Sequence, residues 1–248
     1  MAVFKDHFSK QSEGYSKFRP LYPPELYGHL SDICGAHALV WDCATGSGQA
    51  ARGLAEYFDH IVATDASEQQ IASAAGPDNV SFSVATAEQS GLHPSSVDLI
   101  TVAQALHWFD HGVFFQEVRR VLKPGGVLAA WTYNLLKIDE DIDPVLQRFD
   151  RDIVGAYWPP ERQLVRDEYG TMDFPFDEIP MPAFNMVTLW TLDDLLGYLA
   201  SWSSVVCYQK AKGRDPLTDI HAELGELWGP AADKKPVTWP LSFRVGRL

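Results

Sequence analysis

The feature that most constrains the fold is a regular alternation of short apolar runs and helix-like segments through the first half of the chain. The apolar runs are rich in β-branched residues and occupy residues 38–43, 61–65, 80–84, 97–103 and 126–133. Helix-like segments at 49–58, 67–75 and 113–122 separate them, and Lys123-Pro124-Gly125-Gly126 stops the last helix. Strands that alternate with helices form βαβ units, so the sequence predicts a doubly wound parallel sheet with helices on both faces.

The pattern changes in the second half of the chain. Residues 135–182 are acidic and rich in proline, which predicts a cap inserted into the α/β domain. A strand-like run at 184–190, a helix opened by Thr191 and a strand around 237–245 then follow. We therefore expect a single domain over residues 1–248, with a Rossmann-like, seven-stranded and mostly parallel sheet. Its parts are a cofactor-binding core at 37–134, the cap at 135–182 and a segment at 183–248 that completes the sheet.

Charge and composition exclude several classes of protein. Thirty-three acidic and 20 basic residues give a formal net charge of −13, which repels nucleic-acid backbones and anionic lipid surfaces. The longest apolar runs are too short to span a bilayer, and residues 1–8 lack the pattern of a secretory signal. We expect a cytoplasmic protein with no nucleic-acid or membrane partner, and the sequence carries no signal for an oligomeric state.

Metal and thiol chemistry are also not expected. Cys34, Cys43 and Cys207 are scattered without C-x-x-C spacing, and we interpret them as small buried apolar side chains. There is no H-x-x-H, H-E-x-x-H or Cys/His set, so the sequence predicts no bound metal.

A loop of small residues follows the first strand directly. Ala44, Gly46 and Gly48 allow the backbone to turn sharply and to approach a ligand where side chains would block it. The second strand ends at Asp65, about twenty residues after the loop, where a carboxylate can accept hydrogen bonds from both ribose hydroxyls. Loop and carboxylate together predict a nucleoside-containing cofactor.

Two cofactors compete for this loop. Gly46-x-Gly48-x-x-Ala51 fits the dinucleotide pattern G-x-G-x-x-A, so an NAD(P)-dependent oxidoreductase is one alternative. Asp42 stands just before the loop, where its charge would repel a diphosphate on the helix N-terminus. S-adenosylmethionine carries cationic sulfonium and ammonium groups and no phosphate, so Asp42 favours this cofactor.

Five motifs carry a family resemblance. In order and spacing they resemble the class I S-adenosylmethionine-dependent methyltransferases, and they are residues 40–50, 64–67, 85–88, 104–109 and 122–126. Residues 15–23, 107–109 and 198–203 are similar, more narrowly, to the type 11 branch that includes trans-aconitate methyltransferase. The resemblance implies a methyltransferase that uses S-adenosylmethionine.

The resemblance also implies a set of cofactor-binding residues. Those around the methionine portion are Asp42, Ala44, Gly46 and Gly48, those at the ribose are Asp65 and Ala66, and those at the adenine are Thr86, Ala87 and Glu88. Two of these positions depart from the family: Thr86 replaces a frequent Asp, and Ala44 replaces the first Gly.

The methyl-transfer site is expected after the fourth strand, because open α/β sheets bind ligands at the carboxyl ends of their strands. Gln104, Ala105, His107 and Trp108 lie there. For His107, three roles are open: contact with cofactor or substrate, a general base as candidate catalytic residue, or a structural hydrogen bond. Trp108 either covers the sulfonium by a cation–π contact or fills core space.

Residues 1–36 are expected to form lid helices over the cofactor. Tyr15 and Arg19 belong to this lid, and Arg19 is expected to hold the carboxylate of the methionine or of a substrate.

Three functions remain open from sequence. The favoured one is methyl transfer from S-adenosylmethionine to a small-molecule acceptor, with a carboxylate as one option because it needs no proton removed. The alternatives are an NAD(P)-dependent oxidoreductase and a cofactor-binding protein without turnover.

Overall fold

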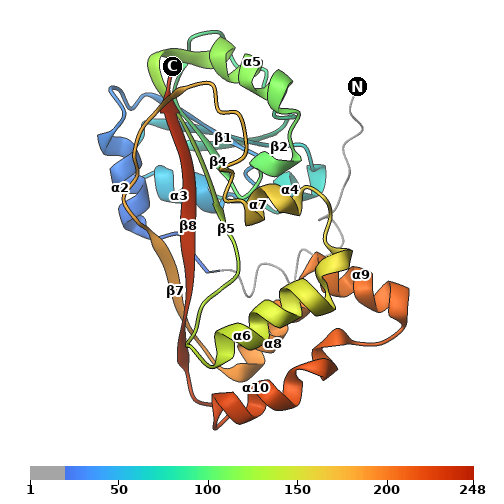
Figure 1. Ribbon diagram of the computed structural model, residues 1–248. Helices are drawn as coiled ribbons and strands as arrows, with labels where there is room; N and C mark the ends of the chain where they lie inside the picture. Colours follow the sequence, from blue (N-terminus) through green and yellow to red (C-terminus); the bar gives the residue numbers. More distant parts are fainter. Residues whose placement is uncertain (1–19) are drawn as a thin grey trace.

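The computed structural model describes residues 20–248, and its centre is an eight-stranded sheet in the order β3-β2-β1-β4-β5-β8-β6, with β7 paired to β8 (Figure 1). The strands are β1 Leu39–Cys43, β2 His60–Asp65, β3 Val80–Val84, β4 Val97–Ala103, β5 Leu122–Tyr133, β6 Asp177–Glu178, β7 Asn185–Trp190 and β8 Lys235–Arg247. This confirms the predicted Rossmann-like α/β fold and all seven predicted strands. The eighth strand, β6, has two residues, too few for an alternating pattern to reveal.

The first five strands are parallel, and β8 joins them antiparallel. Parallel pairing links β3 to β2, β2 to β1, β1 to β4 and β4 to β5, whereas β8 pairs antiparallel with β5, β6 and β7. The strand order reverses between β1 and β4. In doubly wound sheets this switch point is where ligands bind, outside the carboxyl ends of the strands.

Alternate residues of the strands build two hydrophobic cores, one on each face of the sheet. Val40 and Leu99 belong to the core that packs on α2 (Pro24–Asp32) and α3 (Gln49–Leu54). Trp41 and Ile100, their neighbours in sequence, belong to the core under α5 (His111–Val121). Because both faces are buried at the centre of the sheet, β1 and β4 are buried almost throughout, whereas the edge strand β3 alternates between apolar and polar residues. A short helix, α4 (Glu68–Ser73), connects β2 to β3.

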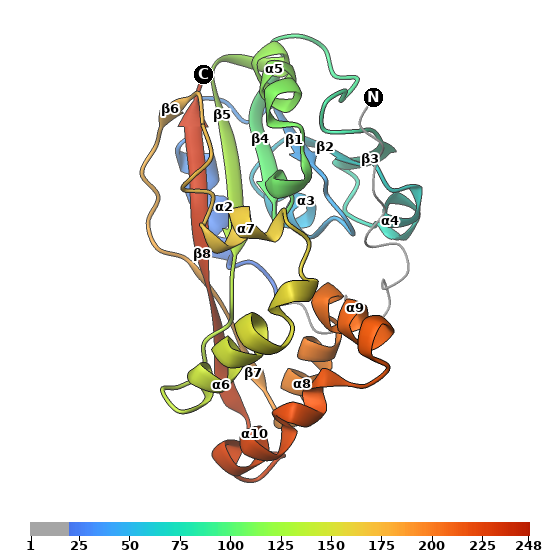
Figure 2. The same cartoon turned by 45° about the vertical axis from the view of Figure 1, so that its right-hand side comes forward.

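A group of helices faces the end of the sheet at which the parallel strands terminate (Figure 2). Its members are α6 Ile142–Arg148, the π-helical turn η2 Phe149–Ile153, η3 Gly155–Tyr157, α8 Leu192–Ala200, α9 Ser203–Lys212, η4 Pro216–Asp219 and α10 His221–Trp228. Thr191 begins α8 with a capping box, in which its side chain and that of Asp194 each accept a bond from the other's backbone N–H. The helix start predicted at Thr191 is thus confirmed.

The proline-rich segment 135–182 divides between two surroundings. Its first half, with α6, packs with α8 and α10 in the helical group. Its second half, with α7 (Arg162–Arg166), packs under the α5 face through Val165, Tyr169 and Phe174. Its role as a substrate cap stays a prediction.

Three smaller findings complete the fold. Tyr15 and Arg19 lie outside the described residues, and so does most of the predicted lid. Cys34 and Cys43 are buried as expected, but Cys207 is exposed on α9, so its interpretation as buried was wrong. That helix turns Ser204, Val205 and Tyr208 inward, which leaves Cys207 on the solvent side. No helix between residues 20 and 248 has the length and hydropathy to span a membrane.

Candidate functional site

The loop after β1 is held in a left-handed backbone conformation that opens space in front of it. The φ angles are +55° at Ala44, +57° at Gly46 and +85° at Gly48. A Cβ atom on Gly46 would find no neighbour nearer than a Gln70 side-chain oxygen at 4.0 Å, whereas one on Gly48 would lie 2.8 Å from the Phe82 ring. Gly48 therefore allows the loop to pack, and Gly46 leaves room for a ligand to approach the backbone.

Asp42 lies beneath this loop and not on its surface. Its carboxylate is fully buried and accepts hydrogen bonds from the hydroxyls of Thr45 at 2.5 Å and Thr101 at 2.7 Å. Burial raises the pKa of Asp42 to about 6, although both hydroxyls oppose the rise. This geometry favours a role in shaping the loop, and direct contact between Asp42 and a cofactor stays a prediction.

Asp65 ends β2 and ties that strand to the loop. Its Oδ2 accepts the Gly46 N–H at 2.9 Å and its Oδ1 accepts the Ser67 N–H at 2.8 Å. The carboxylate is half-buried at the carboxyl edge of the sheet. A carboxylate oxygen can accept more than one hydrogen bond, so the bonds to Gly46 and Ser67 are compatible with the predicted contact between Asp65, beside Ala66, and the ribose hydroxyls.

The turn at Thr86, Ala87 and Glu88 follows β3 along the same edge. Ala87 is buried, and Glu88 accepts the Asp110 N–H at 3.2 Å, which joins the turn to the start of α5. The contact of this turn with adenine stays a prediction.

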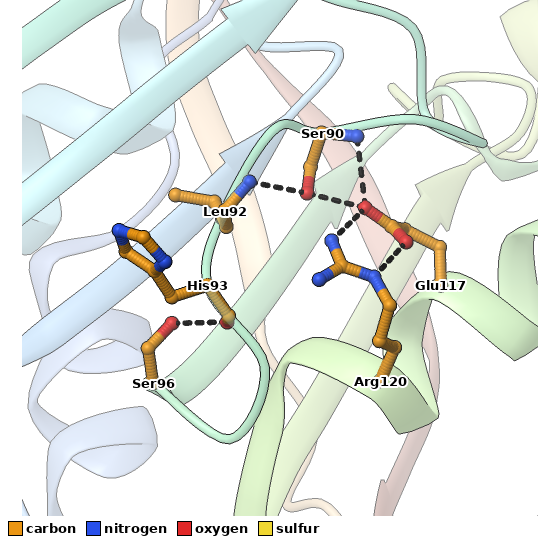
Figure 3. Close-up of polar contacts among 6 residues, drawn as sticks. All are labelled: Ser90, Leu92, His93, Ser96, Glu117 and Arg120. Atoms are coloured by element: carbon orange, nitrogen blue, oxygen red, sulfur yellow. Dashed lines mark hydrogen bonds and ion pairs between the residues drawn. The ribbon is translucent and has the colours of Figure 1, made fainter.

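A buried carboxylate anchors the end of this turn (Figure 3). Glu117 on α5 accepts the backbone N–H of Ser90 at 2.9 Å and its hydroxyl at 2.5 Å, while Arg120 donates to both carboxylate oxygens at 2.7 Å. The Arg120 hydrogen bond is the main reason why the pKa of Glu117 falls to about 2, with the two Ser90 hydrogen bonds adding to it. Glu117 therefore stays ionised at neutral pH and fixes the position of Ser90.

Gln104 connects the ends of β4 and β5. It has a φ of +55°, and its side-chain oxygen accepts the Thr132 hydroxyl at 2.6 Å and the Tyr133 N–H at 2.9 Å. Its amide nitrogen donates to the Tyr133 carbonyl at 3.1 Å. These bonds use the Gln104 side chain to hold the two strand ends together, next to buried Ala105.

His107 belongs to the short 3-10 helix η1 (Leu106–Trp108) and is buried. Its Nδ1 lies 3.0 Å from the hydroxyl oxygen of Tyr169, and the Trp108 ring is 4.7 Å from its own ring. Burial, helped by the charge of Arg162, lowers the pKa of His107 to about 3, so the imidazole is neutral near pH 7. The Trp108 ring lies at a tilt to the His107 ring, and Trp108 is half-buried. Its two predicted roles, a cation–π contact with the sulfonium and core packing, stay predictions.

The predicted residues from Asp42 to Trp108 therefore gather along the carboxyl edge of β1, β2, β3 and β4. Two residues that the sequence did not reveal lie at this edge: Tyr169, which contacts His107, and Arg162, whose charge acts on it. Tyr169 reaches His107 through a turn with positive φ at Glu168 and at itself, +54° and +61°. No sequence signal marks this turn, because neither residue is glycine or asparagine.

Among residues 20–248 no group of three His, Cys, Asp or Glu side chains could hold a metal ion.

These surroundings fit S-adenosylmethionine. The open approach at Gly46, the half-buried acceptor Asp65 and the turn at Ala87 are spaced along one sheet edge in the order required by a methionine portion, a ribose and an adenine. The fit rests on the shape of the loop and on the Asp65 carboxylate.

Comparisons with known proteins agree with this geometry. Residues 41–130 match the model of a methyltransferase domain. A Dictyostelium discoideum protein, named provisionally as a methyltransferase, is 37% identical over 225 residues, which cover 89% of this chain and 86% of the relative. The CRG1 protein of Saccharomyces cerevisiae, named provisionally as an S-adenosylmethionine-dependent methyltransferase, is 24% identical over 88% of each chain.

A solved structure extends the match to three dimensions. It is a provisionally named type II methyltransferase from Anaeromyxobacter dehalogenans, with a TM-score of 0.88, 42% identity, and coverage of 92% of this chain and 97% of that chain. Similarity over nearly the whole chain decides against the nicotinamide-dependent oxidoreductase considered from the loop alone. The chain belongs to the class I S-adenosylmethionine-dependent methyltransferases.

Proposed function

We propose that the protein transfers a methyl group from S-adenosylmethionine to the carboxylate of a small molecule. The acceptor would lie between the carboxyl edge of β4 and β5 and the helical group that faces this edge. Membership of the family does not by itself identify the methyl acceptor.

The proposed cofactor contacts follow the sheet edge. The backbone at Ala44, Gly46 and Gly48 would surround the methionine portion, with Asp42 shaping the loop from below. Asp65, beside Ala66, would accept hydrogen bonds from the ribose hydroxyls. Thr86, Ala87 and Glu88 would border the adenine.

The proposed methyl-transfer site lies at the end of β4. Gln104, Ala105, His107 and Trp108 would line it there, and Tyr15 and Arg19 remain candidates for a lid. When bound, S-adenosylmethionine supplies a methyl group already activated by a positive sulfur. The protein's main task is then to hold the acceptor in line with this methyl group.

One observation carries the choice of a carboxylate: the state of His107. It is buried, hydrogen-bonded to Tyr169 and has a pKa lowered to about 3. A group with so low a pKa is a poor base for an alcohol or an ammonium group, because proton transfer needs a base whose pKa lies near the working pH. A carboxylate is ionised at neutral pH and needs no base.

The experiment that tests this function has two parts. Titration calorimetry should show binding of S-adenosylhomocysteine and none of NADH. Transfer of radiolabelled methyl groups is then measured to small carboxylic acids, phenols, amines, RNA and a protein extract. Label in the small acids supports the proposal, whereas label in RNA or protein with silent acids refutes it.

A further inference from the structure

Arg162 lies at the edge of the sheet next to His107, and no carboxylate among residues 20–248 forms an ion pair with it. Arg162 begins α7, and its Nη2 donates to the side-chain oxygen of Asn134 at 3.2 Å. Asn134 follows β5 directly, and α7 contacts η1, which contains His107. Arg162 is thus fixed at the carboxyl edge of β4 and β5, where open α/β sheets bind ligands.

Arg162 is half-buried, and its charge is only partly compensated by the described residues around it. Its Nε is buried and has no hydrogen-bond partner, and no carboxylate lies within ion-pair distance in the part of the chain that is described. The guanidinium carbon stands 4.9 Å from the centre of the Trp158 ring. Burial accordingly lowers the pKa of Arg162. A half-buried guanidinium whose Nε–H is unpaired is stabilised when an anion binds to it.

The described carboxylate that acts on Arg162 already has other hydrogen-bond partners. Asp150 acts on Arg162 electrostatically, but its Oδ2 accepts a bond from Arg166 at 3.2 Å and its Oδ1 accepts the Trp158 indole N–H at 2.9 Å. Arg166 and Asp150 therefore form the internal ion pair of this region. Arg162, four residues before Arg166, keeps its charge and its Nε–H for another partner.

We infer that Arg162 binds the anionic end of the methyl acceptor and is the residue that selects a carboxylate. A planar guanidinium can donate two parallel hydrogen bonds to a carboxylate, and the guanidinium of Arg162 packs against the Trp158 ring. This inference rests on the proposed function. It gives Arg162 the role of substrate anchor that the sequence suggested for Arg19.

Methyl transfer to a carboxylate requires no base. One oxygen of the acceptor carboxylate attacks the methyl carbon, the carbon–sulfur bond breaks with its electron pair remaining on sulfur, and the products are a methyl ester and S-adenosylhomocysteine. No proton moves. An acceptor with a second carboxylate would let Arg162 hold one group while the other reacts, so di- and tricarboxylic acids should be better acceptors than monocarboxylic acids.

The test compares ligand binding in the wild type, Arg162→Met, Arg162→Lys and a control, Arg148→Met. Arg148, the last residue of α6, forms an ion pair with Glu223 on α10, and both side chains are exposed. Thermal unfolding is followed with saturating S-adenosylhomocysteine and with trans-aconitate, benzoate or benzamide. Affinities for the acids come from calorimetry, and the uncharged benzamide controls for the apolar part of the probe.

We expect trans-aconitate to stabilise the wild type and Arg148→Met, and benzamide to have no effect. Arg162→Met should weaken trans-aconitate binding about 100-fold, and Arg162→Lys, which keeps the charge but loses the planar fork, about tenfold. S-adenosylhomocysteine should bind all four proteins equally, which also shows that each variant is folded. If Arg162→Met does not bind S-adenosylhomocysteine, the comparison of trans-aconitate binding is made between the wild type and Arg162→Lys.

Three results would overturn the inference. They are equal binding of trans-aconitate by the wild type and both Arg162 variants, equal binding of benzoate and benzamide, and failure of both acids to bind the wild type. If S-adenosylhomocysteine did not bind the wild type, the proposed methyltransferase function would be refuted. If S-adenosylhomocysteine bound but the acids did not, only the role of Arg162 and the choice of a carboxylate would be refuted.

Discussion

The Nδ1 atom of His107 and the hydroxyl of Tyr169 meet at 3.0 Å inside the protein, although 62 positions separate the two residues in sequence. This contact joins the end of β4 to the segment that follows α7. It fixes the orientation of the imidazole in an environment that keeps it neutral. We therefore expect His107 to act as a positioning group beside the proposed methyl-transfer site.

The state of His107 predicts a flat pH profile. With a pKa of about 3, His107 does not change its charge near neutral pH, so kcat for a carboxylate acceptor should show no step from this residue. His107→Asn should retain measurable transfer and leave the shape of the profile unchanged. A rising limb near neutral pH that disappears in His107→Asn would identify His107 as a general base after all.

Asp65 is expected to supply much of the cofactor affinity. Asp65→Ala should weaken S-adenosylhomocysteine binding about 100-fold or more, because it removes a charged acceptor whose hydrogen bonds contribute ~1.5–3 kcal/mol each. Calorimetric titration measures the change. Asp59→Ala is the matched control, since Asp59 is exposed just before β2. Equal affinities for the two variants would remove Asp65 from the cofactor site.

Two substitutions in the loop after β1 should differ in their effect on cofactor binding. Gly46→Val should abolish S-adenosylhomocysteine binding, because valine is strained at a φ of +57° and its side chain would fill the open approach. Ala44→Gly should leave binding nearly unchanged and relieve a strain of roughly 1 kcal/mol at a φ of +55°. Calorimetry and thermal unfolding of both variants provide the measurement. Similar binding by the two would place the cofactor elsewhere.

Asp42 predicts a pH dependence of stability. Its pKa rises from 3.8 to about 6 on folding, so the folded protein holds this proton more tightly than the unfolded chain does. The stabilising contribution is present below pH 3.8 and is lost as the pH rises through about 6.

Asp42→Asn removes this titration. The free energy of unfolding of the variant, relative to that of the wild type, should therefore increase by roughly 3 kcal/mol between acid and neutral pH. Urea unfolding of both proteins across this range measures the difference. A difference that stays constant with pH would show that the pKa of Asp42 is not raised by folding.

The sheet was predictable from sequence because both of its faces are buried. Residues 97–103 are mostly apolar, with Asp98 and Thr101 as exceptions, and capping and helix-stop residues mark the ends of several intervening helices. The loop at Gly46 and the carboxylate at Asp65 were predictable for a related reason, since a left-handed turn and a strand-end acid have recognisable residue types.

The acceptor side of the site could not be predicted in the same way. Arg162 and Tyr169 lie in a segment without periodicity, and their importance comes from contacts with Asn134 and His107, which are distant in sequence. Asp42 was predictable as an acid near the loop, but its complete burial depends on the hydroxyl of Thr101 on the neighbouring strand β4. Such contacts are properties of the packed fold and leave no local pattern.

The most direct test of the central claim is the chemical form of the transferred methyl group. The protein is incubated with S-adenosylmethionine tritiated in the methyl group and with trans-aconitate, and the products are then treated with mild alkali. The account predicts that label leaves the donor only when protein and acid are both present, and that alkali releases it as volatile methanol, because a methyl ester hydrolyses. Label that resists alkali, or label that appears only with amines, phenols, RNA or protein, would contradict it.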